Sequence, residues 1–162
     1  MIPFEHLKNL RKIIRRKNWP ITIEDWPNDI NTYTNCAAYS LGLTYKDKEH
    51  TIYSNIISFD EPLSKQVENI LDRLLLNYTK IKDEKEIKNG DIVIIVYKYY
   101  LWNNKKDIDF HFIQKDKLGR WVHKEGWALA PEILRHPLEW EFENCIIEKC
   151  MYVIKKESNL GF

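Results

Sequence analysis

The stretch GDIVIIVYKYY, residues 90–100, is an almost unbroken run of β-branched and aromatic residues that begins with a Gly-Asp pair. β-branched and aromatic side chains favour the extended backbone, and Gly-Asp is typical of a turn. The run therefore predicts a strand. Residues 107–116 (DIDFHFIQKD) and 117–126 (KLGRWVHKEG) predict two shorter strands joined by a turn, and residues 144–156 alternate like a last strand.

Helical patterns come before these strands. Residues 63–81 place apolar side chains on one helical stripe, and residues 36–43 predict a short helix that Gly42 ends. Residues 4–17 have the spacing of an amphipathic helix, and an irregular loop follows them. This order of predicted elements, with helices first and strands after them, predicts an α+β fold in which N-terminal helices pack on an antiparallel sheet. We expect a single domain over 1–162, made of a helix and approach loop (1–34), two helices (35–81) and the sheet (87–156).

Composition excludes several classes of protein. The chain of 162 residues is 44% hydrophobic and 30% charged, which is typical of a globular domain, and its net charge of +1 offers no global field for nucleic acid. No apolar run is long enough for a membrane span or a signal peptide, so we expect no membrane insertion. The expected location is the cytoplasm as synthesised, while delivery elsewhere by a route that needs no signal stays open.

Three cysteines are an odd number and do not form a disulfide framework. Cys145 and Cys150 lack the spacing of a zinc site, and structural thiols explain them best. No other group of His, Cys, Asp and Glu has metal-ligand spacing, so we expect neither a metal nor another cofactor. The remaining cysteine, Cys36, begins the predicted helix at 36–43, where backbone N–H groups and the helix dipole favour the nucleophilic thiolate.

A cysteine nucleophile needs a base, and the base needs a group that fixes its tautomer. Of the five histidines, His111 lies on one predicted strand and His123 lies twelve residues later on the next. If the turn between them forms a hairpin, the two imidazoles come close across it. A buried structural thiol and two strand histidines bonded to backbone would be the purely structural interpretation, but the three residues together favour a nucleophile.

NCAAYSLGL (35–43), IKNGDIVIIVY (87–97) and DFHFIQKDKLGRWVHKEG (109–126) together resemble the NlpC-type branch of the papain-fold cysteine peptidases and amidases. The resemblance implies a papain-like fold, with Cys36 as nucleophile, His111 as general base and His123 as orienting residue. Glu125 is an alternative orienting acid, and Asp116 is a weaker one. The bulky Phe112 stands where the family has a small residue, which predicts a narrowed cleft or a divergent subgroup.

The implied reaction is attack of Cys36 on an amide carbonyl through a thioacyl-enzyme. The oxyanion would be held by the Cys36 backbone N–H and one upstream donor. That donor is one of Tyr33, Asn31 and Asn35.

The expected function is therefore a cysteine hydrolase that cleaves an amide bond in a peptide, a peptidoglycan fragment or a protein. Two alternatives stay open, a protein glutamine deamidase or acyltransferase of effector or toxin type and a binding module without catalysis. The sequence shows no wall-binding repeat, which favours phage, toxin or intracellular roles over wall remodelling.

Overall fold

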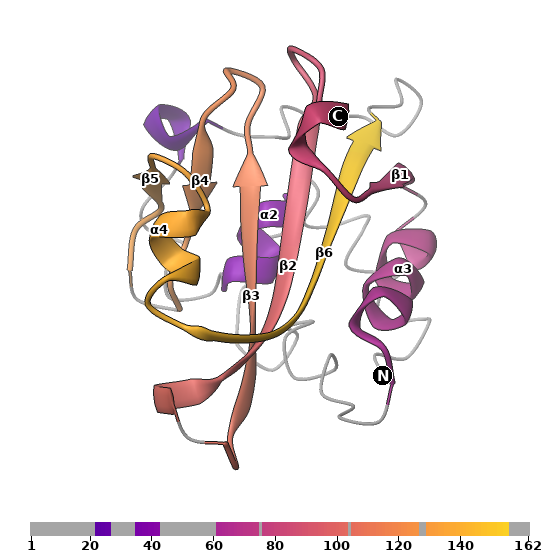
Figure 1. Cartoon of the computed structure of the whole chain (residues 1–162). Coiled ribbons are helices and arrows are strands. Elements are labelled where there is room, and N and C mark those ends of the chain that lie inside the picture. Colours follow the sequence, from indigo (N-terminus) through magenta and orange to yellow (C-terminus); the bar gives the residue numbers. More distant parts are fainter. Residues whose placement is uncertain are drawn as a thin grey trace.

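The computed structural model describes residues 22–26, 35–42, 61–74, 76–103, 105–126 and 129–155. They form an α+β arrangement around a six-stranded antiparallel sheet with the order β1-β6-β2-β3-β4-β5 (Figure 1). The strands are β1 (Asn77–Ile81), β2 (Ile92–Tyr100), β3 (Ile108–Lys115), β4 (Trp121–His123), β5 (Glu132–Leu134) and β6 (Cys145–Lys155). The helices are η1 (Ile23–Asp25), α2 (Cys36–Leu41), α3 (Leu63–Arg73), η5 (Glu84–Glu86), η6 (Leu101–Asn103) and α4 (Leu138–Glu141).

The predicted strand at 90–100 is confirmed as β2, which is buried along most of its length. The chain enters it through a turn in which the Asp91 N–H donates to the Lys88 carbonyl and Gly90 adopts a φ of +86°. That left-handed backbone favours glycine, which explains why the Gly-Asp pair marks the start of the strand. The expected helix at 4–17 and most of its approach loop lie outside the described residues.

Two features of the expected order are wrong. The helix predicted over 63–81 ends at Arg73, and residues 77–81 form β1, which pairs along β6 from Asn77↔Lys155 to Ile81↔Met151. Leu74 and Leu76 remain buried in the same core as α3, so the apolar stripe continues although the helix does not. Strand pairing therefore overrides the local helical pattern.

The helices also do not all come before the sheet, because α4 lies between β5 and β6. The last strand, β6, does not extend a meander at the edge, since it lies between β1 and β2 and pairs with both.

The sheet has a core on each face. On one face, alternate residues of β2, β3 and β6 pack against α2 and α3; on the other, they pack around Trp140 of α4 (Figure 1). The alternation of strand side chains therefore sends neighbouring residues of β3 into different layers, with Phe110 and Phe112 on the α2 side and Ile113 on the α4 side. Within the described parts of the chain, no helix is long and apolar enough to span a bilayer.

Candidate active site

Cys36 is the first residue of α2, and its neighbours fix the start of that helix. The Oδ1 atom of Asn35 accepts a hydrogen bond from the Ala38 N–H at 2.8 Å, the usual geometry of a helix N-cap. Gly42 ends the helix in the left-handed conformation, with a φ of 72°. Every residue of α2 is buried, so this short helix owes its position to packing rather than to its intrinsic stability.

The sulfur of Cys36 lies at an open edge of β3. Strand β4 pairs only from Ile113 to Lys115, which leaves residues 108–112 of β3 without a described strand partner on that side. The Cys36 thiol reaches this edge and donates to the Phe110 carbonyl at 3.9 Å. Helix α2 lies on one face of the sheet, and its first side chain, Cys36, therefore reaches the edge of β3. Side chains from the other face of the sheet are also accessible at this edge.

His111 and His123 meet on the opposite face from α2. His111 is paired with Tyr97 of β2, and His123 is paired with Ile113, so the two imidazoles are diagonal neighbours on one face. Their rings are perpendicular, and Nε2 of His111 lies 2.8 Å from Nδ1 of His123. The predicted approach of the two histidines is confirmed.

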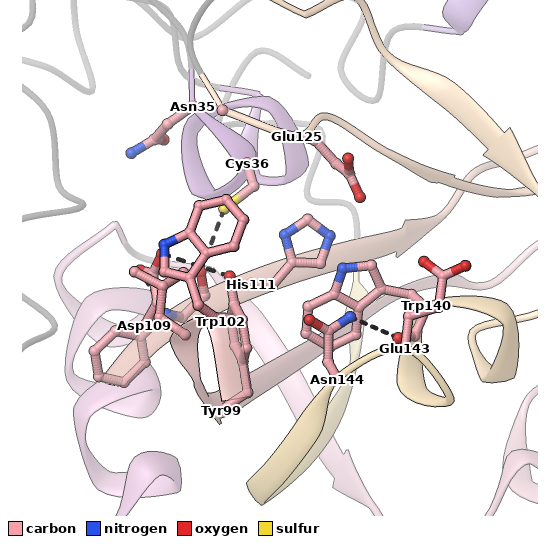
Figure 2. Close-up of a pocket in the computed structure, with 13 residues that line it drawn as sticks. Asn35, Cys36, Tyr99, Trp102, Asp109, His111, Glu125, Trp140, Glu143 and Asn144 are labelled. Carbon is pink, nitrogen blue, oxygen red and sulfur yellow. Dashed lines mark hydrogen bonds between the residues drawn. The ribbon is translucent and has the colours of Figure 1, made fainter. Parts of the chain in front are cut away.

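The indole of Trp140 stacks on the ring of His111. The two rings are stacked, with centroids 4.5 Å apart and an interplanar angle of 19°. Figure 2 shows the imidazole of His111 between the Cys36 sulfur and this indole. His111 is thus fixed by one hydrogen bond and one stacking contact, and no described residue makes a recorded hydrogen bond to its Nδ1 atom.

Cys36 and His111 line one pocket of about 630 Å³. The other lining residues are Asn35, Tyr99, Leu101, Trp102, Asp109, Phe110, Glu125, Gly126, Trp140, Glu143 and Asn144. His123 is not among them, because it lies behind His111 and is only 2% exposed. A molecule bound in this pocket can therefore contact the Cys36 thiol and the His111 imidazole, and His123 is hydrogen-bonded to His111 from behind.

Burial keeps this thiol and these imidazoles neutral. Burial raises the pKa of Cys36 to about 12, and Asp109 adds to the effect, while backbone N–H groups of Phe112 and Ala37 oppose it. Burial lowers the pKa of His111 to about 3, helped by the nearby His123, whose own pKa falls to about 4. The expectation that the helix terminus favours a thiolate is therefore wrong, because desolvation outweighs the dipole of a six-residue helix.

The other sequence-predicted residues have mixed placements. Glu125 lines the pocket but makes no recorded hydrogen bond to His111, whose Nε2 atom is directed to His123. Asp116 instead holds the β3–β4 turn by accepting from the backbone of Leu118 and Arg120.

The Asn35 amide caps α2 and points away from His111 in Figure 2, so its role as an oxyanion donor stays a prediction. Tyr33 and Asn31 lie outside the described residues. Phe112 does not narrow the cleft, since it is buried in the core on the α2 side and is not a lining residue.

Sequence reasoning missed several lining residues. The pattern that predicts a strand at 90–100 gives no indication of a site at its end, yet Tyr99, Leu101 and Trp102 line the pocket. Asp109 precedes His111 by two residues, and strand alternation places both on one face, which is a signal that the sequence did contain. Trp140, Glu143 and Asn144 come from α4 and the turn after it, for which no pattern in the sequence indicated proximity to Cys36.

The two neutral imidazoles predict a loss of stability in mild acid. The unfolded chain binds protons on them below about pH 6.5, whereas the folded protein binds them only near its lowered pKa values of about 4 and 3. The unfolded state therefore holds more protons in this window, and the free energy of unfolding falls as the pH falls from about 6.5 to 4, by several kcal/mol in total. Urea titrations at a series of pH values measure this slope.

The control for this prediction is the double variant His111→Gln, His123→Gln. Other titrating groups are shared by the two proteins, so the difference between their slopes isolates the imidazoles. An equal slope in both proteins would contradict the buried neutral pair.

No protein-family model matches the chain, and no curated protein matches it in sequence. Within the described ranges, no three His, Cys, Asp or Glu side chains are grouped so that they could hold a metal ion.

Proposed function

We propose that this protein is a papain-like cysteine hydrolase that cleaves an amide bond. The observation that supports the proposal best is one pocket that contains both the Cys36 thiol and an imidazole whose other nitrogen is hydrogen-bonded to a second buried imidazole. A nucleophile, a base and a group that orients the base are the minimal set for acyl transfer. Three residues from α2, β3 and β4 supply that set.

The reaction begins from the neutral pair. Nδ1 of His111 takes the thiol proton as the Cys36 sulfur forms a bond to the amide carbonyl carbon, so the two charges arise together with the attack. For Nδ1 to accept, the ring must carry its proton on Nε2, which then donates to Nδ1 of His123. His123 thereby selects the reactive tautomer of His111 and stabilises the imidazolium that forms.

The remaining steps return the enzyme to its starting state. His111 gives its proton to the leaving amine as the C–N bond breaks, which leaves a thioacyl bond to Cys36. Water then attacks that carbonyl with His111 again as base, the C–S bond breaks, and the product carboxylate and the thiol are released. The Cys36 backbone N–H is the first candidate to stabilise the oxyanion, since the Asn35 cap takes up the Ala38 N–H instead.

The proposal is tested by incubating the protein with peptidoglycan fragments and with a peptide mixture, and analysing protein and products by mass spectrometry. We expect acyl adducts on Cys36 after rapid acid quenching, new carboxyl termini in the products, and neither in the Cys36→Ala variant. Ammonia release without backbone cleavage would instead identify a deamidase. Tight binding by both proteins with no covalent adduct would overturn the proposal in favour of a binding module.

A further inference from the structure

The pocket around Cys36 carries negative charge. Three of its lining residues are carboxylates, Asp109, Glu125 and Glu143, and none of the lining residues is a lysine or arginine. Figure 2 shows Asp109 and Glu125 on opposite sides of His111, so the carboxylates surround the reactive pair instead of forming one local cluster. A bound molecule would meet negative charge on more than one side.

These carboxylates have no recorded cationic partner among the described residues. Asp109 accepts from the Tyr99 hydroxyl at 3.4 Å and from the Phe110 N–H at 2.8 Å, both neutral donors. The ion pairs recorded for the described lysines and arginines go to acids outside the pocket, such as Lys98–Glu148 and Lys149–Glu141. One described cation acts on the site from outside the lining: the buried Lys124 donates to the Gly126 carbonyl and lowers the pKa of Cys36. The lining residues themselves supply three acidic side chains and no lysine or arginine.

Two of the pocket carboxylates act on a neighbouring group: Glu143 disfavours the ionised form of Glu125, and Asp109 disfavours the thiolate of Cys36. Burial raises the pKa of Glu125, and the neighbouring Glu132 and Glu143 raise it further. Burial likewise raises the pKa of Asp109, and Asp109 in turn raises the pKa of Cys36. A positive charge placed in the pocket would relieve the repulsion and would favour deprotonation of Cys36 at the same time.

Two further observations indicate that the pocket is built for a ligand. His111 is only 5% exposed, yet its Nδ1 atom has no recorded partner in the described chain while its ring lines the pocket. Trp102 lines the same pocket and is 86% exposed, although an indole in a monomer usually packs. An aromatic face beside carboxylates is a favourable site for an ammonium or guanidinium group.

We propose that the pocket selects a substrate with an ammonium or guanidinium group beside the scissile amide, held by Asp109, Glu125 and Glu143 with Trp102 at the mouth. The inference rests on the proposed hydrolase function for its scissile amide. The charge preference of the pocket is testable without a substrate. A cationic ligand has a second effect, because it offsets the contribution that Asp109 adds to the raised pKa of Cys36, while burial remains the larger cause.

The test uses three methanethiosulfonate reagents that transfer a cationic (trimethylammonium-ethyl), neutral (methyl) or anionic (sulfonate-ethyl) thio group. In each reaction the Cys36 sulfur attacks the reagent sulfur, a disulfide forms, methanesulfinate leaves and the thiol proton passes to His111 or to water. Peptide mapping gives the rate at Cys36, normalised to the rate of each reagent with 2-mercaptoethanol. The exposed Cys145 is an internal reference in the same sample.

We expect normalised rates at Cys36 to fall from the cationic to the neutral to the anionic reagent, by about tenfold or more from first to last. Glu125 and Glu143 are exposed, so the double variant Glu125→Gln, Glu143→Gln should fold and should reduce this ratio. Adding Asp109→Asn should bring the ratio of cationic to anionic rates at Cys36 close to the same ratio at Cys145. Asp72→Asn, which removes an exposed charge on α3, should leave the ratio unchanged.

A ratio at Cys36 equal to that at Cys145, or one unaffected by the variants, would overturn the inference. That result would leave the proposed hydrolase function standing if the neutral reagent still reacted with Cys36 in a His111-dependent way. Loss of that dependence would overturn the function instead, so the two failures are distinguishable.

Discussion

The His111→Gln variant is expected to lower the reactivity of Cys36 with iodoacetamide by about 10²–10⁴-fold at neutral pH. The buried thiol has a pKa of about 12, so few thiolates exist in advance, and the imidazole must take the proton as the sulfur reacts. Glutamine keeps a polar side chain of similar reach but cannot act as the base. The rate is measured by peptide mapping of the Cys36 peptide over time.

Cys150 is the internal control for this experiment. It too is buried, and burial raises its pKa to about 12, but it lies in the core between the sheet and α3 and is not a pocket residue. Cys36 should react much faster than Cys150 in the unmodified protein, and the His111→Gln change should remove most of that difference. His136→Gln, which alters a half-buried histidine bonded to Glu84 outside the pocket, should change neither rate. An unchanged Cys36 rate in His111→Gln would refute the base role.

The Phe112→Ala variant is expected to lower the free energy of unfolding by about 3–5 kcal/mol. Phe112 is 1% exposed and belongs to the core on the α2 side of the sheet, so its removal leaves a cavity in a packed layer. Urea denaturation of the two proteins measures the difference. The residue supports the layer on which α2 rests, and it therefore matters for stability although it does not line the pocket.

Phe142→Ala is the matched control, because this ring is 82% exposed and its loss should change the stability by no more than about 0.5 kcal/mol. A loss below about 1 kcal/mol in Phe112→Ala would show that the core does not depend on this ring.

The parts that could be predicted from the sequence are those set by short-range patterns. The β-branched run predicted β2, and the alternation at 107–116 predicted β3. The predicted turn between β3 and β4 placed His111 near His123. Gly42 marked the end of α2 because capping is a local interaction, whereas the structure showed that Asn35 caps its start. The end of α3 could not be predicted, since Leu74 and Leu76 are apolar in the helical register and only pairing with β6 makes residues 77–81 a strand.

The sequence by itself determined the strands β2, β3, β4 and β6, the end of α2 at Gly42, the hairpin and the three candidate catalytic residues. Only the tertiary structure decided that β6 lies between β1 and β2, that α4 places Trp140 against His111, and that Cys36 reaches an open edge of β3 from the other layer. It also decided the charge state, for burial leaves the thiol and the imidazole neutral among carboxylates. The physical reason is range: backbone preference acts between near neighbours in the chain, whereas desolvation and Coulomb interaction depend on what the fold brings together.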